Sequence, residues 1–378
     1  MKICHLTSAH PRYDTRIFIK QSVSLARNGH DVTLIVADGK GNAEKDKVTI
    51  IDVGIGSFGR LERMTRTVLN VYKAAMLVDA DIYHFHDPEL IPAGLLLKMI
   101  AKRVIYDVHE DYPKAIVSRP YLPPLLRRAI AAAFRKLEEF SVRLFDGVVP
   151  ATPVIAKRFE KLNKYTVLVQ NFPILDELHI SEDILWDKRS NTVAYLGVIS
   201  ELRGAKEMVE AIFQASEKSA ARLVLAGFFS PESYENEIKS LEGWALTEFK
   251  GYLDREQVAH LFATIKAGMV LFHPEPNHVS AQPNKLFEYM SAGIPVIASD
   301  FPLWREIVEE SQSGLLVDPM KPEEIAKAIS FLFENPDKAE KMGKCGRQAI
   351  KEKYNWDLEK IKLIELYDVL LAEKRKKI

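Results

Sequence analysis

The segment that follows residue 272 carries residue types that could bind a charged ligand. Lys285 and Glu288 lie near the start of a predicted helix, directly after a polar loop that ends at Pro283. A helix N-terminus binds anions, because its first backbone N–H groups have no partner within the helix and its dipole adds to their field. The lysine would add positive charge, and the glutamate would accept hydrogen bonds from hydroxyls. The pattern therefore predicts a site for a ligand that carries both phosphate and hydroxyl groups.

A second candidate anion site follows a predicted strand near residue 197. The segment YLGVISELRGAKEMVEAI places Gly197 at the end of the strand, and Arg203 and Lys206 near the start of the next helix. Arg203 could hold a phosphate with two parallel hydrogen bonds, whereas Lys206 would act as a point charge. A surface helix with two basic residues is the alternative. This junction has no GxGxxG motif, and we expect no dinucleotide or other cofactor.

The turn after the first predicted strand is also polar. The segment HLTSAHPRYDTRIF places His10, Arg12 and Asp14 at the carboxyl end of that strand, where ligands of parallel sheets bind. Capping of the next helix by Asp14 or Thr15 is the alternative. The three residues are more polar than a helix cap requires, so they remain candidates for ligand contacts.

Two further strand ends combine histidine with acidic residues. IYHFHDPEL contains His84, His86 and Asp87, and YDVHEDYP contains His109. Histidine and carboxylate are common metal ligands, but no cysteine is near, and the first two histidines share a sheet face only if the strand extends that far. We therefore expect no metal site. A strand-end His109 is better placed to contact a sugar or to carry a proton.

Length and composition indicate an ordinary globular protein with two domains. The chain has 378 residues, of which 47% are hydrophobic and 28% charged. Lys+Arg and Asp+Glu both number 52, so no net charge suggests a nucleic-acid partner. The two cysteines have no metal-ligand spacing, which favours a reducing compartment. No signal peptide or membrane-spanning run is apparent, so we expect a cytoplasmic protein.

Short β-rich runs alternate with helix-length stretches along the whole chain, which predicts an α/β fold with parallel sheets covered by helices. We predict two Rossmann-like domains, residues 1–170 and 192–354, with a linker at 171–191. Ligands are expected in the cleft between them, at the carboxyl ends of the strands. The predicted strands are Ile3–Leu6, Val32–Val36, Val48–Val53, Ile82–Phe85, Val104–Asp107, Val148–Val149, Val167–Val169, Val193–Leu196, Leu223–Ala226, Leu246–Lys250, Gly268–Phe272, Pro295–Ala298 and Leu315–Val317.

Residues 119–136, RPYLPPLLRRAIAAAFRK, combine an apolar helix with five basic residues. Such a helix could lie on an anionic membrane surface. It could equally be a core helix with a solvated basic edge, and composition alone slightly favours the second interpretation.

Together these motifs resemble the retaining glycosyltransferases of family 4, which have the two-domain GT-B fold, over essentially the whole chain. PNKLFEYMSAGIPVIASD resembles the donor-site signature of the bacterial polysaccharide branch, and SAHPRYDTRIF, YDVHEDYP and YLGVISELRG resemble the same branch. The resemblance implies transfer of a sugar from a UDP- or GDP-linked donor with retention and without an essential metal. It also implies a glycan or lipid-diphosphate-linked acceptor, work at the inner face of the membrane in cell-surface polysaccharide synthesis, and a C-terminal helix (355–378) that packs on the N-terminal domain.

The resemblance assigns roles to individual residues. Glu288 matches the second glutamate of the family's Glu-x7-Glu signature and would bind the ribose hydroxyls. Arg203 would hold the diphosphate, His109 would contact the donor sugar near the reacting centre, and Lys285 is assigned to phosphate on physical grounds. His109, Arg203 and Lys285 are therefore the predicted catalytic residues. The other predicted donor-site residues are Gly197, Ser280, Asn284 and Leu286, and the predicted acceptor-side residues are His10, Arg12 and Asp14.

The chain departs from the family pattern at two positions. Ser280 stands where the first glutamate of the signature often lies, and Val198 stands where a basic residue often follows the strand-end glycine. No clear carboxylate nucleophile emerges, which favours same-face attack by the acceptor hydroxyl, assisted by the leaving phosphate. Two alternatives stay open, namely another GT-B enzyme such as an epimerase, hydrolase or phosphorylase, and a non-catalytic module that binds sugar nucleotides.

Overall fold

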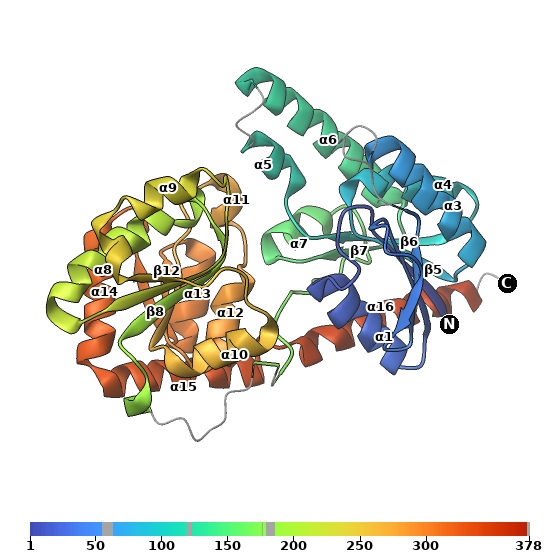
Figure 1. Cartoon of the computed structure of the whole chain (residues 1–378). Helices are drawn as coiled ribbons and strands as arrows, with labels where there is room; N and C mark the ends of the chain where they lie inside the picture. The colour runs from blue at the N-terminus through green and yellow to red at the C-terminus, as the bar shows by residue number, and fades with distance from the viewer. Residues whose placement is uncertain (55–62, 119–122, 176, 179–185, 376–378) are drawn as a thin grey trace. The chain divides into compact units, whose positions relative to one another are not determined.

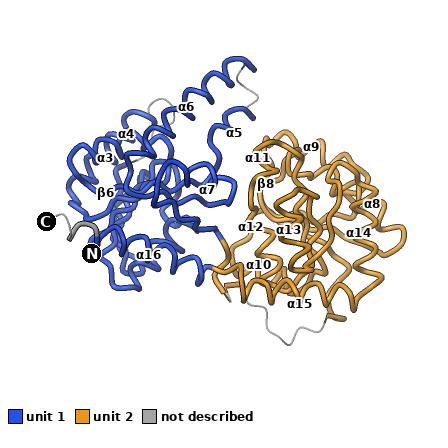
Figure 2. The backbone as a smooth tube through the Cα atoms, turned by 180° about the vertical axis from the view of Figure 1, so that it is seen from behind, with its two compact units in different colours: residues 1–171, 356–378 blue, residues 172–355 orange. Residues whose placement is uncertain are grey.

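The computed structural model describes the chain except for residues 55–62, 119–122, 176, 179–185 and 376–378 (Figure 1). The chain divides into two compact units, which are coloured separately in Figure 2. The first unit contains residues 1–171 and 356–378, and the second contains residues 172–355.

The first unit is built on a seven-stranded sheet in the order β3-β4-β2-β1-β5-β6-β7. Every neighbouring pair is parallel except β3 and β4, which are antiparallel. The sequence did not predict the three-residue strand β3. The predicted strand at 167–169 is not a strand in the structure, and an isolated bridge to Val148 lies just before it, at Thr166. The strands are β1 (Lys2–Leu6), β2 (Asp31–Val36), β3 (Ala43–Lys45), β4 (Val48–Asp52), β5 (Ile82–Phe85), β6 (Arg103–Val108) and β7 (Gly147–Pro150).

Helices cover both faces of this sheet, as expected for parallel strands that are buried on both sides. The first crossover begins with a π-helical stretch, Thr15–Ser22, that continues into α1. The C-terminal helix α16 belongs to this unit: its Trp356 indole donates a hydrogen bond to the Ser24 hydroxyl at 2.8 Å. The α-helices are α1 (Val23–Arg27), α3 (Val68–Val78), α4 (Ile91–Met99), α5 (Tyr112–Val117), α6 (Pro124–Leu144), α7 (Pro153–Phe159) and α16 (Trp356–Arg375).

The second unit has a six-stranded, fully parallel sheet in the order β10-β9-β8-β11-β12-β13. Its strands are β8 (Thr192–Ile199), β9 (Arg222–Phe229), β10 (Thr247–Phe249), β11 (Ala267–Val270), β12 (Val296–Ser299) and β13 (Gly314–Val317). Its α-helices are α8 (Ala205–Ser219), α9 (Tyr234–Lys239), α10 (Arg255–Thr264), α11 (Pro276–Val279), α12 (Asn284–Ser291), α13 (Pro302–Ser311), α14 (Pro322–Glu334) and α15 (Pro336–Glu352).

The segment predicted as a linker, 171–191, contributes to the core of the second unit. Phe172 is buried, with its ring centroid 4.8 Å from that of Phe287 and 5.3 Å from that of Tyr354. Leu178 and Trp186 are also buried. The segment lacks helical or strand periodicity, so its sequence pattern gave no sign that single large side chains anchor it.

Candidate functional site

In the second unit, Glu288 is a buried carboxylate held between two cations. It is the fifth residue of α12, and its two oxygens accept hydrogen bonds from Lys285 Nζ at 2.7 Å and Arg255 Nη1 at 2.9 Å. Burial raises the pKa of the Glu288 carboxyl, but Lys285 and Arg255 outweigh that effect and lower the pKa to about 2. Glu288 is therefore an ionised hydrogen-bond acceptor at neutral pH.

Arg255 is a site residue that the sequence reasoning missed. It is the first residue of α10 and also grips Glu177, with Nε to Oε1 at 2.9 Å and Nη2 to Oε2 at 2.8 Å. The two carboxylates fix its guanidinium in one position. The capping box formed by Asp254 and Gln257 marks the helix start in the sequence, but no local signal links that start to Glu288.

Arg203 lies in a short 3₁₀ turn, Glu201–Arg203, that leads into α8. Its guanidinium lies 4.0 Å from the centre of the Phe272 ring, just beyond β11. The turn fits closely because Gly204 has a φ of +71°, and a Cβ there would lie 2.1 Å from the Leu271 carbonyl oxygen. Arg203 is thus positioned at the carboxyl edge of the sheet, beside the loop that carries Ser280.

Of the other predicted donor-site residues, Gly197 lies on β8, and Ser280, Asn284 and Leu286 lie just before or within the first turn of α12. Asn284 is exposed and begins the helix, no side chain caps this end, and the Leu286 side chain is fully buried in the core. The Ser280 hydroxyl donates to the Pro276 carbonyl at 3.1 Å. Gly197 was predicted to end its strand, but β8 continues to Ile199.

In the first unit, Asp107 is a fully buried carboxylate at the end of β6. Arg16 binds it with Nη2 at 2.7 Å from Oδ1 and Nε at 3.1 Å from Oδ2, and Gln21 donates to Oδ2 at 2.5 Å. Burial raises the pKa of Asp107, but Arg16 and His109 outweigh it and lower the pKa well below its usual range. This ion pair ties the first helical crossover to the sheet.

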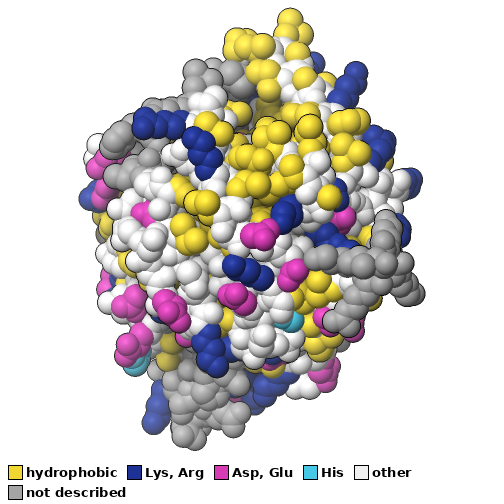
Figure 3. Space-filling model, turned by 90° about the vertical axis from the view of Figure 1, so that its right-hand side faces the viewer, with side chains coloured by type: hydrophobic (Ala, Val, Ile, Leu, Met, Phe, Trp, Pro, Cys, Tyr) yellow, Lys and Arg dark blue, Asp and Glu magenta, His cyan; other side chains and the backbone are white. Residues whose placement is uncertain are grey.

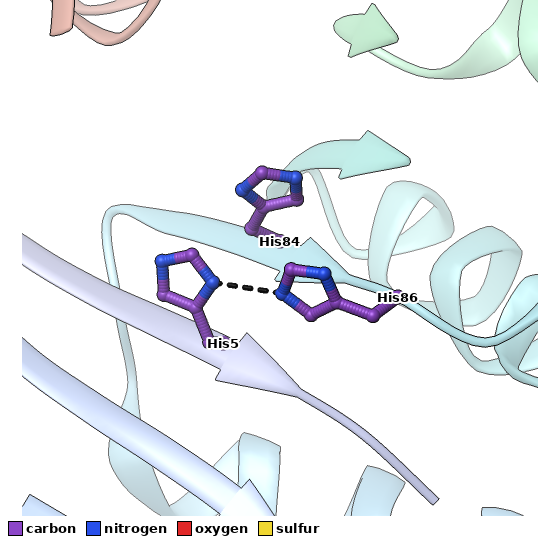
Figure 4. A group of neighbouring side chains, drawn as sticks. All are labelled: His5, His84 and His86. Carbon is purple, nitrogen blue, oxygen red and sulfur yellow. Dashed lines mark hydrogen bonds between the residues drawn. The ribbon is translucent and has the colours of Figure 1, made fainter. Parts of the chain in front are cut away.

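Three buried histidines, His5, His84 and His86, lie together on one face of the sheet (Figure 4). His5 Nδ1 and His86 Nε2 share a hydrogen bond of 2.9 Å, and His84 Nδ1 lies 2.6 Å from the hydroxyl of Tyr367 on α16. Burial lowers the pKa of both His5 and His84 well below its ordinary value, so these rings are neutral. His84 and His86 therefore do share a face, which the sequence analysis left open.

The described residues contain two groups with metal-ligand side chains in close proximity: His5, His84 and His86, and His86, Asp107 and His109. The first group has no carboxylate and is completely buried. In the second, Asp107 already accepts hydrogen bonds from Arg16 and Gln21. An arginine on the ligand carboxylate opposes a divalent cation, so the second group fits a resident metal poorly.

The three predicted acceptor-side residues have different surroundings. Arg12 is buried against Asp38, with its Nε 2.7 Å from Oδ2, and also donates to the Gly41 carbonyl at 3.0 Å. Asp14 caps the first helical crossover by accepting hydrogen bonds from two backbone N–H groups. Both have structural contacts, whereas the side chain of His10 is 30% exposed.

His109 follows β6 and is partly exposed. Its Nε2 lies 3.3 Å from His86 Nδ1 and 3.6 Å from Asp107 Oδ2, and its ring centroid is 5.0 Å from that of His10. The structure thus brings His10 and His109 together in the first unit. It also brings Lys285 and Glu288 together in the second.

A GxGxxG pattern does occur elsewhere in the sequence, at Gly54, Gly56 and Gly59. In dinucleotide-binding folds this fingerprint follows the first strand of the βαβ unit and opens a helix. Here it follows β4, which lies next to the edge strand β3, and residues 55–62 are outside the described part of the chain. The expectation of no dinucleotide cofactor therefore rests on strand position as well as on the junction near Gly197.

Comparisons with known proteins agree with this architecture. Residues 19–170 match the family described as Glycosyltransferase Family 4, and residues 176–349 match Glycosyl transferases group 1. The fold is similar to sucrose-phosphate synthase from Thermosynechococcus elongatus, with a TM-score of 0.79 and 19% identity over 98% of this chain and 99% of that chain. It is also similar to Anabaena HepE in complex with UDP, with a TM-score of 0.73 and 15% identity over 98% and 100% of the two chains.

The first curated relatives match this chain over only part of their own length. In the first curated relatives, the matched region spans less than half of the relative's length, with shares of 43%, 22% and 20%. Phosphatidyl-myo-inositol mannosyltransferase from Mycobacterium leprae is 22% identical over 83% of this chain and 80% of that protein.

Two parallel-sheet α/β units of this kind, with a C-terminal helix that rejoins the first, define the GT-B fold. The two glycosyltransferase family models match the two halves of this chain in turn. The chain therefore belongs to the family 4-like glycosyltransferases.

Proposed function

We propose that this glycosyltransferase moves a hexosyl-type sugar from a UDP- or GDP-linked donor to a glycan or lipid-linked glycan in cell-surface polysaccharide synthesis. The proposal includes retention at the anomeric carbon and independence from metals and cofactors. Its main support is the ionised Glu288 of α12, held between Lys285 and Arg255. The similar HepE protein was solved with UDP bound, which supports a nucleoside diphosphate donor.

The proposed donor contacts follow from charge. Glu288 accepts hydrogen bonds from the ribose hydroxyls, and Arg203 and Lys285 hold the diphosphate. Lys285 now contacts Glu288, but Arg255 also neutralises that carboxylate. Lys285 can therefore turn to the phosphate without leaving Glu288 buried and unpaired.

The proposed mechanism relies on the leaving diphosphate, which gains negative charge in the transition state. Arg203, Lys285 and the uncapped start of α12 therefore stabilise the transition state, which carries this charge, more than they stabilise the ground state. His109 contacts the donor sugar. Ser280 offers a hydroxyl where a carboxylate is usual, so no enzyme nucleophile is invoked, and the acceptor hydroxyl attacks from the face that the phosphate leaves.

Donor binding can be tested with UDP-glucose and GDP-mannose in a thermal-shift assay in EDTA. The matched donor is expected to add about 2.7 kcal/mol to the free energy of unfolding at about 100 times its Kd. Slow release of nucleotide and sugar, unaffected by EDTA, is expected for the stabilising donor. Loss of turnover in EDTA contradicts metal independence, an epimerised donor indicates an epimerase, and binding without turnover indicates a non-catalytic module.

We further propose that α6 and α4 contact an anionic membrane, where a lipid-linked acceptor resides. Leu125 and Phe140 on α6 are 81% and 56% exposed, and Met99 at the end of α4 is 81% exposed. Figure 3 shows hydrophobic side chains gathered on this side of the molecule, with basic side chains nearby. Of the segment predicted for this role, residues 119–122 lie outside the described residues. Among the described residues no helix has the length and hydrophobicity of a membrane span.

The membrane contact predicts that the protein pellets with vesicles containing phosphatidylglycerol and not with pure phosphatidylcholine. Charge reversal of Arg127 and Arg128 to glutamate is expected to abolish pelleting, because the basic groups attract the anionic surface and the apolar side chains then insert. Lys344→Glu, at an exposed position of α15 in the second unit, is the matched control. Equal pelleting of the double variant and wild type would contradict this contact.

A further inference from the structure

Three buried imidazoles face one another within the first unit, on the two neighbouring strands β1 and β5 (Figure 4). His5 on β1 is paired in register with His84 on β5, and His86 follows two residues later. Because side chains alternate along a strand, His84 and His86 lie on the same face of the sheet. The ring centroids of the three are 4.9, 5.2 and 4.8 Å apart, and one nitrogen of each ring lies within 4.8 Å of the others.

Two of these rings have one nitrogen held by a partner outside the group. His84 Nδ1 lies 2.6 Å from the Tyr367 hydroxyl, and His86 Nδ1 lies 3.2 Å from Asp107 Oδ2. Metal-binding histidines use one ring nitrogen in this way, because the outer hydrogen bond sets the tautomer and orients the ring. The Nε2 atoms of His84 and His86 are then the nitrogens that can bind a ligand.

Hydrogen bonds within the group leave part of it unsatisfied. His5 Nδ1 and His86 Nε2 share a hydrogen bond of 2.9 Å. Among the described residues, the buried Nε2 atoms of His5 and His84 have no hydrogen-bond partner. His84 Nε2 lies 3.8 Å from Asp107 Oδ2, which is too far for a hydrogen bond. Buried polar atoms without a partner destabilise a fold, so His84 Nε2 in particular indicates a ligand.

We propose that His5, His84 and His86 bind one structural transition-metal ion, for which Zn²⁺ is the best fit. Imidazole nitrogens suit Zn²⁺, whereas Mg²⁺ and Ca²⁺ prefer oxygen ligands. Zinc–nitrogen distances of about 2.0–2.1 Å in a tetrahedral site put neighbouring nitrogens about 3.3 Å apart. The 2.9 Å between His5 Nδ1 and His86 Nε2 therefore needs to open only slightly, and the ion replaces their hydrogen bond. A water molecule completes the four ligands.

The charges around the group are compatible with a bound cation. Burial lowers the pKa of both His5 and His84 well below its ordinary value, so both rings are in the neutral form that binds metals. The carboxylate of Asp107, which orients His86, is balanced by Arg16, so this neighbouring pair carries no net charge.

The position of the ion indicates a structural role. It links β1 to β5, two strands near the centre of the sheet, and reaches α16 through the hydrogen bond from His84 to Tyr367. Because all three rings are buried, the ion is acquired as the unit folds and is not removed by EDTA from the folded protein. From the sequence we expected no metal site, since the meeting of His5 with His84 depends on strand pairing. The proposed metal independence of sugar transfer is unaffected, and this inference does not rest on the proposed function.

Metal content provides the first test. The full chain, free of any affinity tag, is produced in medium supplemented with Zn²⁺, dialysed against metal-free buffer and analysed by mass spectrometry of the elements. We expect about one zinc per chain. Protein grown with Co²⁺ instead is expected to show the visible absorption of a four-coordinate nitrogen site, without a thiolate charge-transfer band. Folded wild-type protein with far less than one metal ion per chain would overturn the proposal.

Variants show whether these histidines hold the ion. His5→Gln and His84→Gln are each expected to lose the bound zinc while circular dichroism shows a folded chain. His260→Gln, at an exposed position of α10 in the second unit, is the matched control and is expected to keep it. Zinc that stays at the wild-type level in both His5→Gln and His84→Gln would mean that the ion binds elsewhere. If neither variant folds, the cobalt spectrum of wild type decides, because a thiolate band or an octahedral spectrum contradicts a site of three histidines.

Thermal unfolding tests the structural role. EDTA captures the ion once the unit opens, so the midpoint of wild type is expected to be about 5–10 °C lower in EDTA than in buffer with free Zn²⁺. The midpoints of His5→Gln in the two buffers are expected to agree. A wild-type midpoint that EDTA leaves unchanged would overturn the structural role. None of these measurements uses a nucleotide or a sugar, so their outcome is independent of the donor assignment.

Discussion

Replacing Glu288 with alanine is expected to abolish sugar transfer while the protein stays folded. The change removes the ionised acceptor that we assign to the ribose hydroxyls, and two hydrogen bonds to a charged group are worth about 3 kcal/mol or more, which corresponds to a loss of at least about 100-fold in kcat/KM. The fold should survive because Arg255 keeps its contacts with Glu177 and Lys285 is partly exposed. Arg203→Ala is expected to cause a similar loss in kcat/KM, because Arg203 is assigned to the diphosphate of the donor.

Transfer assays and circular dichroism of both variants check this expectation. Glu309→Ala removes an exposed carboxylate on α13 and serves as the matched control. Transfer that persists in both Glu288→Ala and Arg203→Ala would mean that the donor binds elsewhere.

The second large effect is on stability, where Asp107→Asn is expected to cost about 3–5 kcal/mol of unfolding free energy. The reason is that Arg16 is buried and would lose its counter-charge, and that Gln21 would lose a charged acceptor. Urea unfolding at pH 7 measures the change. Adding Arg16→Met to this variant is expected to recover part of the loss, since the uncompensated charge is then removed as well.

The pair formed by Arg305 and Asp300 provides the matched control. It has the same two-pronged geometry, with Nε to Oδ1 at 2.7 Å and Nη2 to Oδ2 at 2.5 Å, but lies at the surface. Asp300→Asn is therefore expected to change stability little, because water screens exposed ion pairs. If Asp107→Asn costs no more than Asp300→Asn, the buried ion pair does not hold the first crossover in place.

Much of the fold could be predicted from the sequence because buried parallel strands and their helical crossovers leave clear apolar patterns. The missed strand β3 has only three residues, with one half-buried and two exposed, and carries no such pattern. The segment 171–191 was interpreted as a linker because its burial depends on a few separate side chains, above all Phe172 and Trp186. Single anchors of this kind have no periodicity to detect.

The candidate site was predictable where its residues are close in sequence. Lys285 and Glu288 lie one helical turn apart, so their meeting follows from helix geometry. Arg255 contacts Glu288, and Asp87 contacts His10, although the members of each pair are far apart in the sequence. Only the tertiary fold brings them together. The sequence could not show whether Asp14 caps a helix or contacts a ligand, because a carboxylate can do either. In the structure it caps the first helical crossover.

Isothermal titration of the wild-type protein with UDP and with GDP, in EDTA, tests the central claim most directly. We predict saturable binding of one of the two nucleotides, weakened at least about 100-fold in Glu288→Ala, because the carboxylate held by Lys285 and Arg255 is assigned to the ribose. Absence of binding by both, or an affinity that Glu288→Ala leaves unchanged, would contradict this account of the site.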